Sequence, residues 1–340
     1  MVERLAGDQG ARAVLQQVGD PGLGLAFQFG GGTAFAEQAQ FAGAASVEAL
    51  GGQRIASRGA LADGDFEAAR DLFAQTLELA PHWPPAHFAL AKACLGLGEQ
   101  AAAAAALRRV QALDPQDRLG AGVLLAQVEC SPPVMPDAYV AGLFDEYAPR
   151  FDTHLVDALN YRAPAMLTDL LRDVAGEAMH FPAALDLGCG TGLMARALAS
   201  RFGEMAGVDL SAGMLAVAQR SGLYARLEAA ELLAFLRREA DASADLVLAA
   251  DVFCYVPDLA PVFIEARRVL KFGGLFAFSI QTQTGEGVAI GADSRVHHAP
   301  VQIRAWAAAA GLTIGREMAA STREDRGQPV AGALFVLAKG

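Results

Sequence analysis

The chain has 340 residues, of which 53% are hydrophobic and 19% are charged, and its formal net charge is −11 at pH 7. A chain of this length exceeds one typical domain and can bury at least one large core. Its basic residues gather only in single pairs such as Arg108-Arg109, which excludes the electrostatic footprint of a nucleic-acid-binding protein. We therefore expect a small molecule or a protein as the partner.

Hydropathy and cysteine spacing indicate the cellular compartment. No segment reaches the roughly eighteen uninterrupted apolar residues of a membrane span, and the N-terminus lacks the apolar core of a signal peptide. The sequence therefore predicts a cytoplasmic protein without membrane association. Zinc and disulfide frameworks are not expected either, because no C-x-x-C spacing occurs among the four cysteines, Cys94, Cys130, Cys189 and Cys254.

Residues 1–50 are rich in Gly, Ala and Gln, and we leave this N-terminal extension without an assigned role. Its triplet Gly30-Gly31-Gly32 lacks the preceding strand and the lysine of a phosphate-binding loop. A flexible or loosely packed segment is the favoured interpretation.

A 34-residue repeat follows, in residues 51–130. Each copy predicts a helix, the first from Gly64 to Leu79 and the second from Gly98 to Leu113. Small residues at equivalent positions let paired helices approach closely, and larger apolar residues fill the groove between them. We expect Asp117 to Glu129 to form a capping helix. The residues that carry the repeat are Gly64 and Gly98, Ala69 and Ala103, Phe73 and Leu107, and Pro81 and Pro115.

These copies resemble tetratricopeptide repeats. Two copies are fewer than the three that an independent solenoid usually needs. Two interpretations therefore stay open with equal weight: an accessory helical domain that supports the rest of the chain, or a groove that binds a protein partner.

A proline-rich linker is predicted at residues 131–137, because its three prolines preclude a regular helix. Residues 138–180 then predict helices that lead into the second half of the chain. Tyr147 and Phe151 lie four residues apart, which places them on one face of a helix, either as core residues or as part of a lid.

A glycine turn is the most informative feature of the chain. An apolar strand leads into Gly188-Cys189-Gly190-Thr191-Gly192, and a second strand ends at Asp209-Leu210. The glycines let the backbone approach a ligand closely, and the helix that starts there offers unpaired N–H groups. Asp209 can accept hydrogen bonds from a ribose diol. This pattern predicts a nucleoside-cofactor site.

Two cofactor classes compete for this turn. A dinucleotide turn requires Gly or Ala three residues after Gly190, and the chain has Leu193 there. Asp186, just before the turn, would repel a pyrophosphate but suits an ammonium group. The turn therefore favours S-adenosylmethionine (SAM), which carries an amino-acid end and an adenosine end.

The acidic residue and the glycine pattern D-x-G-x-G-x-G resemble those of class I SAM-dependent methyltransferases, and the combination with the repeat resembles predicted methyltransferases that contain tetratricopeptide repeats. The resemblance implies a methyltransferase domain at 181–340, with residues 138–180 as lid helices. It implies SAM as the cofactor and methyl transfer as the activity. The cofactor-binding residues it implies are Asp186, Gly188, Cys189, Gly190, Thr191, Gly192, Asp209, Leu210, Met214, Glu231, Leu232, Asp251, Tyr147 and Phe151.

The remaining elements predict an α/β fold: a Rossmann-like sheet with a closing antiparallel hairpin, preceded by an all-α tetratricopeptide-type domain. We expect a helix over Pro261–Leu270 and a turn over Lys271–Gly274. The expected strands are Tyr224–Leu227, Asp245–Asp251, Leu275–Ile280, and an antiparallel pair formed by Leu312–Glu317 and Gly332–Lys339 with Arg326 to Pro329 between them.

The acceptor is not evident from the sequence. His298 and Tyr255 are the catalytic candidates, because the resemblance implies an Arg-x-x-His that Arg295 and His298 match, and Tyr255 follows a buried strand. A small-molecule substrate is favoured, with a protein acceptor as the alternative. Two further alternatives are a non-catalytic SAM-binding adaptor that acts through the repeats, and a SAM-dependent enzyme of another reaction type.

Overall fold

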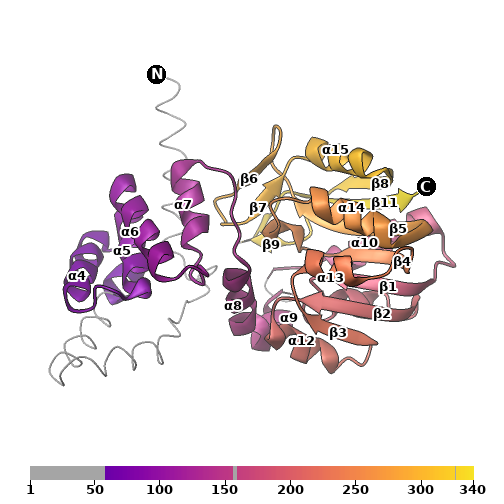
Figure 1. Ribbon diagram of the computed structural model, residues 1–340, viewed down its shortest axis with the longest axis horizontal. Coiled ribbons are helices and arrows are strands. Elements are labelled where there is room, and N and C mark those ends of the chain that lie inside the picture. Colours follow the sequence, from indigo (N-terminus) through magenta and orange to yellow (C-terminus); the bar gives the residue numbers. More distant parts are fainter. Residues whose placement is uncertain (1–57, 156–158, 326) are drawn as a thin grey trace. The chain divides into compact units, whose positions relative to one another are not determined.

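The computed structural model describes residues 58–155, 159–325 and 327–340 (Figure 1). The N-terminal extension with Gly30–Gly32, residues 51–57 of the repeat region, Val156 and Arg326 lie outside these ranges. The chain divides into two compact units. The helical unit contains the described residues up to Tyr139 together with Ile290–Ser294, and the α/β unit contains Val140–Ala289 and Arg295–Gly340.

The described part of the helical unit includes the helices α4 (Phe66–Leu79), α5 (Pro84–Gly96), α6 (Gln100–Leu113) and α7 (Ala121–Glu129). The predicted helices that end at Leu79 and Leu113 are thus confirmed. Asp65 explains the start of α4, since its carboxylate accepts a hydrogen bond from the Ala68 N–H over 3.1 Å. The repeat residues behave as expected, because Ala69, Ala103, Phe73 and Leu107 are all buried between the helices. Trp83, just before α5, is buried in the same core.

The capping helix starts later than the sequence predicts. Asp117 has a left-handed φ of 51°, and its carboxylate accepts hydrogen bonds from the N–H groups of Ala121 and Gly122, over 2.6 and 2.7 Å. These donors belong to the first turn of α7, so Asp117 caps the helix from outside it. The prediction of a helix from Asp117 was therefore wrong by four residues at its start, while Glu129 is its end as predicted.

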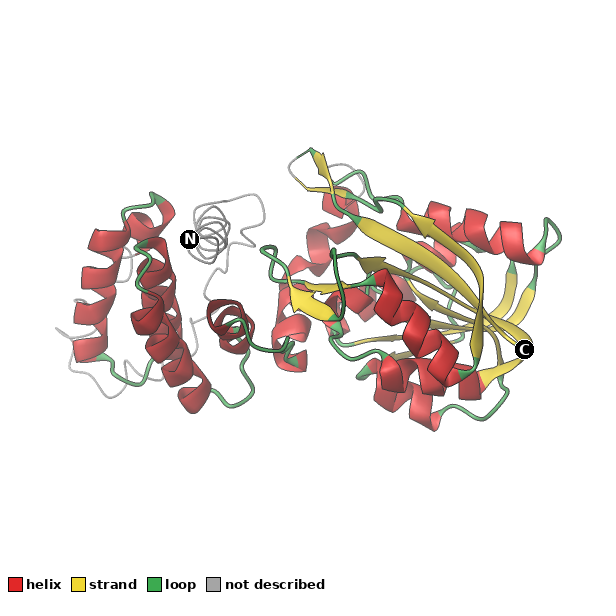
Figure 2. Cartoon of the chain, turned by 90° about the horizontal axis from the view of Figure 1, so that it is seen from above, coloured by secondary structure: helices red, strands yellow, loops and turns green. Residues whose placement is uncertain are grey.

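The α/β unit is built on a seven-stranded sheet in the order β3-β2-β1-β4-β5-β11-β8, with helices on both faces (Figure 2). β11 pairs antiparallel with both β5 and β8, which confirms the predicted closing hairpin. The strands are β1 (Phe181–Leu187), β2 (Phe202–Asp209), β3 (Arg226–Ala229), β4 (Ala244–Ala249), β5 (Leu270–Gln281), β8 (Leu312–Ala319) and β11 (Gly332–Lys339), with two short pairs formed by β6 (Val288–Ile290) and β7 (Val296–His298) and by β9 (Glu324–Asp325) and β10 (Gln328–Pro329).

Side chains alternate across this sheet and divide its core in two. Phe276, Phe278 and Phe335 face one cluster, where α13, α14 and α15 cover the sheet. Leu275 and Leu334, one position away, face the other cluster, against α10 and α11. Apolar residues on both faces explain why the strands are continuous hydrophobic runs. The helices are α10 (Ala163–Ala175), α11 (Leu193–Ala197), α12 (Ala212–Gln219), α13 (Leu232–Arg238), α14 (Ala260–Val269) and α15 (Pro300–Ala310), with a short turn η3 (Phe253–Tyr255).

Three strand predictions need correction. β4 was predicted to end at Asp251 but ends at Ala249, two residues earlier. β3 begins at Arg226, two residues after the predicted start, because the Tyr224 side chain is used elsewhere, in a hydrogen bond to Asp186. The predicted turn over Lys271–Gly274 lies within β5 as an irregularity of the ladder: Ala244 pairs with Leu270, whereas Leu246 already pairs with Leu275. The extra residues bulge out of the sheet, and Phe272 is 85% exposed.

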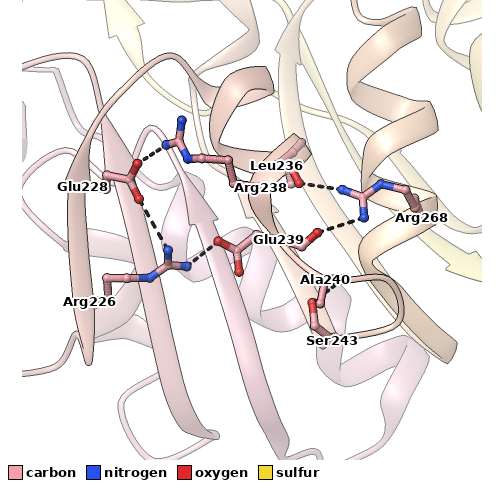
Figure 3. A network of polar contacts seen from close by, with 8 residues as sticks. All are labelled: Arg226, Glu228, Leu236, Arg238, Glu239, Ala240, Ser243 and Arg268. Atoms are coloured by element: carbon pink, nitrogen blue, oxygen red, sulfur yellow. Dashed lines mark hydrogen bonds and ion pairs between the residues drawn. The ribbon is translucent and has the colours of Figure 1, made fainter.

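A polar network joins β3 to α13 and α14 (Figure 3). Arg226 forms ion pairs with Glu228 and Glu239, and Arg238 pairs with Glu228 as well. Arg268 of α14 donates to the carbonyl oxygens of Leu236 and Glu239, over 2.7 and 2.9 Å. Glu228 is therefore ion-paired with two arginines.

Candidate active site

The glycine turn follows β1 at the carboxyl edge of the sheet. Gly188, Gly190 and Gly192 all have left-handed backbones, with φ of 62°, 53° and 88°. A Cβ atom on Gly188 would lie 2.5 Å from the Cγ2 atom of Val252, so that position requires glycine. A Cβ on Gly190 would meet nothing within 4 Å. The backbone at Gly190 is therefore open to close approach by a ligand.

Asp209 ends β2 and bonds directly to this turn. One carboxylate oxygen accepts a hydrogen bond from the Gly190 N–H over 2.9 Å, and the other accepts from the Ser211 N–H over 2.8 Å. Burial raises the pKa of the Asp209 carboxyl, while these two backbone donors oppose the rise. Each oxygen keeps a second lone pair for another donor. The adjacent Leu210 continues the chain toward α12.

Asp186, the penultimate residue of β1, is almost completely buried. The Tyr224 hydroxyl donates to its carboxylate over 2.7 Å. Burial raises the pKa of Asp186 to about 7, the Tyr224 hydrogen bond opposes the rise, and the charge of Asp209 adds to it. A cation placed beside this carboxyl would stabilise its ionised form.

The other residues predicted at the turn are mostly buried and structural in their contacts. Burial raises the pKa of the Cys189 thiol far above its usual value, which keeps it protonated. The Met214 N–H donates to the Ser211 hydroxyl, which caps α12 over 3.0 Å. Thr191 is buried and donates its hydroxyl proton to Asp152.

Glu231 caps α13, and Leu232 is the first residue of that helix. The Glu231 carboxylate accepts hydrogen bonds from the N–H groups of Leu233 and Ala234, over 2.8 and 2.7 Å. This is the helix-start role that competes with adenine recognition. The remaining lone pairs of the carboxylate leave room for a further donor.

Two carboxylates of the segment before the sheet contact the predicted site, and the sequence did not reveal them. The first part of the predicted lid (138–180), residues 138–155, is called the lid segment below. It contains α8 (Asp137–Tyr147) from its second residue, η1 (Ala148–Arg150) and α9 (Phe151–Thr153). Asp145 accepts from the Ser211 hydroxyl over 2.6 Å and from the Gly213 N–H over 2.9 Å. Asp152 accepts from Thr191 and, over 2.7 Å, from Arg196. Their position among the aromatic residues of the segment was the available signal.

The prediction that Tyr147 and Phe151 share one helix is wrong, because α8 ends at Tyr147 and a 3-10 turn containing Pro149 follows. The two rings still meet edge to face, with centroids 5.2 Å apart. Phe144 continues the cluster to Phe151 at 6.1 Å and to Tyr255 at 5.2 Å. The lid segment therefore packs against the residues that follow β4.

Asp251 follows β4 and has a left-handed φ of 55°. Its carboxylate accepts hydrogen bonds from the hydroxyls of Ser279 and Thr322, over 2.7 and 3.1 Å. It also forms an ion pair with Arg323, whose nitrogen lies 2.9 Å away and whose side chain is 5% exposed. Sequence reasoning missed Thr322 and Arg323, because they lie more than 70 residues away along the chain.

The two catalytic candidates lie in different surroundings. Tyr255 is partly exposed, and its hydroxyl accepts a hydrogen bond from Arg295 over 3.1 Å. His298 is completely buried, with its Nε2 atom 3.0 Å from the Phe253 carbonyl oxygen and its ring against Trp306. Burial lowers the pKa of His298 to about 4. A neutral imidazole that holds η3 suits positioning of Tyr255 better than contact with an acceptor.

Comparison with known families agrees with this geometry. Residues 185–278 match the model of a methyltransferase domain, and residues 60–127 match that of a tetratricopeptide repeat. The chain combines a methyltransferase domain with tetratricopeptide repeats. The methyltransferase match spans β1 to β5, and thus includes the glycine turn, Asp209 and Asp251.

The similarity to individual known proteins extends over only part of this chain and part of theirs. Human methyltransferase-like protein 27 is 44% identical over 85 residues, 25% of this chain and 34% of its own length. A ubiquinone biosynthesis O-methyltransferase of Pseudomonas fluorescens is 30% identical over 148 residues, 38% of this chain and 64% of its own length. The chain thus spans less than two thirds of these relatives. A solved 1,6-didemethyltoxoflavin-N1-methyltransferase of Burkholderia thailandensis has 18% identity and a TM-score of 0.47, covering 62% of this chain and 92% of its own.

Proposed function

We propose that this protein binds SAM and transfers its methyl group to a small-molecule acceptor. The observation that carries the proposal is the junction of the glycine turn with Asp209. Gly190 has open space where a side chain would be, and its N–H group holds the carboxylate that ends β2. Backbone access and a ribose acceptor are thereby combined at one edge of the sheet.

The buried carboxyl of Asp186 supports the choice of cofactor. A carboxyl with a pKa of about 7 inside the protein gains stabilisation from a cation placed beside it. The amino-acid end of SAM offers an ammonium group for this purpose, whereas a pyrophosphate would add a second anion. The residues present therefore fit SAM: Asp186 for the ammonium, Asp209 for the ribose, and Glu231 with the Leu232 N–H for the adenine.

Bound SAM supplies an activated methyl group on a sulfonium centre. The protein then has to position the acceptor and exclude water. The lid segment suits the second task, since Asp145 and Asp152 bond it to the starts of α12 and α11. Tyr255, held by Arg295, is the candidate for contact with the acceptor. The buried thiols of Cys189 and Cys254 are not needed as nucleophiles.

The proposal also covers the role of the repeats and the cellular compartment. The buried core of α4 to α7 supports a folded module, which either stabilises the enzyme or binds a protein partner. We place the protein in the cytoplasm because all four cysteines are free, as a reducing compartment requires. Within the described part of the chain, no helix combines the length and the apolar character that a membrane crossing demands.

Calorimetry with SAM, S-adenosylhomocysteine and NAD tests the cofactor. We expect binding of the first two and none of NAD. A screen of candidate metabolites for S-adenosylhomocysteine release then tests the reaction. Tight NAD binding without a SAM signal would refute the proposal, whereas SAM binding with no turnover across the screen would favour the adaptor alternative.

A further inference from the structure

One terminal nitrogen of the Arg323 side chain takes no part in its ion pair. One guanidinium nitrogen, Nη1, pairs with Asp251. The other terminal nitrogen, Nη2, is buried and has no hydrogen-bond partner in the described structure. A buried cationic N–H group without an acceptor is costly, and native proteins rarely retain one without a function. Arg323 therefore has an unused donor at the carboxyl edge of the sheet.

The segment that carries Arg323 is held firmly in place. The Arg162 N–H donates to the Thr322 carbonyl oxygen over 2.8 Å, and the Glu324 N–H donates to the Leu159 carbonyl oxygen over 2.7 Å. The Val330 N–H donates to the carbonyl oxygen of Arg323 itself over 3.1 Å. Backbone bonds on both sides fix the chain at Arg323, and the ion pair with Asp251 holds the guanidinium, which lowers the entropic cost of binding a ligand.

Three tyrosine hydroxyls lie close enough to Arg323 for its charge to affect them. Burial raises the pKa of Tyr147, Tyr161 and Tyr255, and the charge of Arg323 opposes the rise in each case. The pKa of Tyr147 reaches about 12. All three hydroxyls stay protonated near pH 7. That of Tyr147 is bonded to His154 Nδ1, and that of Tyr255 accepts from Arg295 and keeps its proton for another acceptor. A guanidinium among neutral donors suits an anion with oxygen acceptors.

Arg323 lies apart from Gly190 and Asp209, although Asp251, which it contacts, is among the predicted cofactor residues. Gly190 and Asp209 follow β1 and β2, whereas Asp251, which pairs with Arg323, follows β4 and accepts a hydrogen bond from Ser279 of β5. β2, which ends at Asp209, and β4, which Asp251 follows, are two strand spacings apart, about 10 Å. The ammonium and carboxylate of SAM share one carbon, so both belong near Asp186. This position favours the acceptor as the source of the anion.

We propose that the free side of the Arg323 guanidinium binds a carboxylate of the methyl acceptor. The proposal rests on the proposed function and names its substrate class: small molecules that carry a carboxylate close to the methylated atom. Asp251 then serves to orient Arg323, and the planar guanidinium binds one carboxylate on each side.

The test uses calorimetry to compare the binding of carboxylate probes with the binding of their amides. The protein is the full chain saturated with S-adenosylhomocysteine. The probes are acetate, benzoate and phenylacetate, each paired with acetamide, benzamide or phenylacetamide. We expect at least one carboxylate to bind and its amide not to bind. Arg323→Lys should weaken that binding about tenfold or more, because lysine can keep the ion pair with Asp251 but lacks the second arm.

Arg162→Lys is the matched control, since Arg162 is an exposed arginine whose side chain donates to the neighbouring Ser321 carbonyl oxygen. It should leave probe binding unchanged, and thermal unfolding checks that both variants fold. Three results would overturn the proposal: no carboxylate binds, each carboxylate binds like its amide, or Arg323→Lys binds the probe as the wild type does.

A second titration tests whether Arg323 binds the carboxylate of the cofactor instead of that of the acceptor. If Arg323→Lys weakens S-adenosylhomocysteine binding but leaves 5′-methylthioadenosine binding intact, Arg323 binds the cofactor's carboxylate and the acceptor assignment is wrong. Failure of S-adenosylhomocysteine to bind the wild type would contradict the proposed function instead. In that case the probe titration on the free protein still tests Arg323.

Discussion

The Asp145 carboxylate accepts a hydrogen bond from the Ser211 hydroxyl over 2.6 Å, which joins the lid segment to the helix that begins beside Asp209. The same oxygen accepts from the Gly213 N–H. Ser211 is fully buried, whereas Asp145 is exposed, so the contact joins the surface of the lid segment to the interior. We therefore expect the lid segment to be coupled to the predicted ribose site.

Asp145→Ala should loosen this coupling and weaken S-adenosylhomocysteine binding by about 1 kcal/mol, the net contribution of a typical hydrogen bond after solvent competition. Most of the change should be in the dissociation rate, measured by stopped-flow displacement. Asp145→Asn is the matched control, because its amide oxygen can still accept both hydrogen bonds. Equal dissociation rates for the wild type and Asp145→Ala would contradict the coupling.

Asp209→Ala should weaken SAM binding by about 1 to 3 kcal/mol, because ribose hydroxyls lose a charged acceptor. Gly190→Val should weaken it further. Its φ of 53° is unfavourable for a β-branched residue, and the side chain would occupy the open space beside the turn. Calorimetry measures both variants, and circular dichroism confirms that they fold. Wild-type affinity in two folded variants would place the cofactor elsewhere.

S-adenosylhomocysteine should bind about tenfold more tightly at pH 8 than at pH 6. The ammonium group requires the ionised form of Asp186, and with a pKa of about 7 that form is scarce at pH 6. Asp186→Asn should bind more weakly and lose this dependence. Calorimetry in buffers of different ionisation enthalpy should detect proton release near pH 7 in the wild type only. A flat pH profile for the wild type would refute the role of Asp186.

The same pKa shift affects stability in the absence of ligand. The folded state holds the Asp186 proton more tightly than the unfolded state, whose carboxyl titrates near its usual 3.8. This group therefore lowers the free energy of unfolding as pH rises from about 4 to about 7. Asp186→Asn should be less sensitive to pH across that range. Urea denaturation at pH 5 and pH 7.5 compares the two proteins.

His298→Ala should destabilise the α/β unit by about 1 to 3 kcal/mol, since it leaves the buried Phe253 carbonyl oxygen without its donor. His298→Asn is the companion variant, with a shorter side chain that keeps a donor. Urea denaturation measures both. With the pKa of His298 lowered to about 4, turnover should have no titration of this group between pH 6 and 8. Normal stability with lost turnover in His298→Ala would instead identify a catalytic residue.

The features predicted correctly from the sequence are those determined by neighbours in the chain. The glycine turn, the repeat helices and the closing hairpin each follow from local pattern and spacing. The start of α7 was wrong because Asp117 caps the helix from a position that looks helical in composition. The prediction of one helix for Tyr147 and Phe151 was wrong because Pro149 interrupts the chain between them with a 3-10 turn.

The missed residues depend on distant partners. Asp251 follows β4 and Arg323 follows β8, two strands that β5 and β11 separate in the sheet, so the two residues meet only in the complete fold and no local spacing relates them. Tyr224 resembled a strand residue, yet its hydroxyl reaches Asp186 on another strand. Hydrophobic periodicity reports which face of an element is buried, but it does not report which polar side chains meet at its end.

Each unit of the chain carries one of its two tryptophans. Trp83 is buried in the helical unit, and Trp306 packs against Phe263 and His298 in the α/β unit. Replacing either one with phenylalanine leaves a single indole, whose emission follows the unfolding of one unit alone. Intrinsic fluorescence can thus reveal whether the repeats and the methyltransferase domain melt together or in separate transitions.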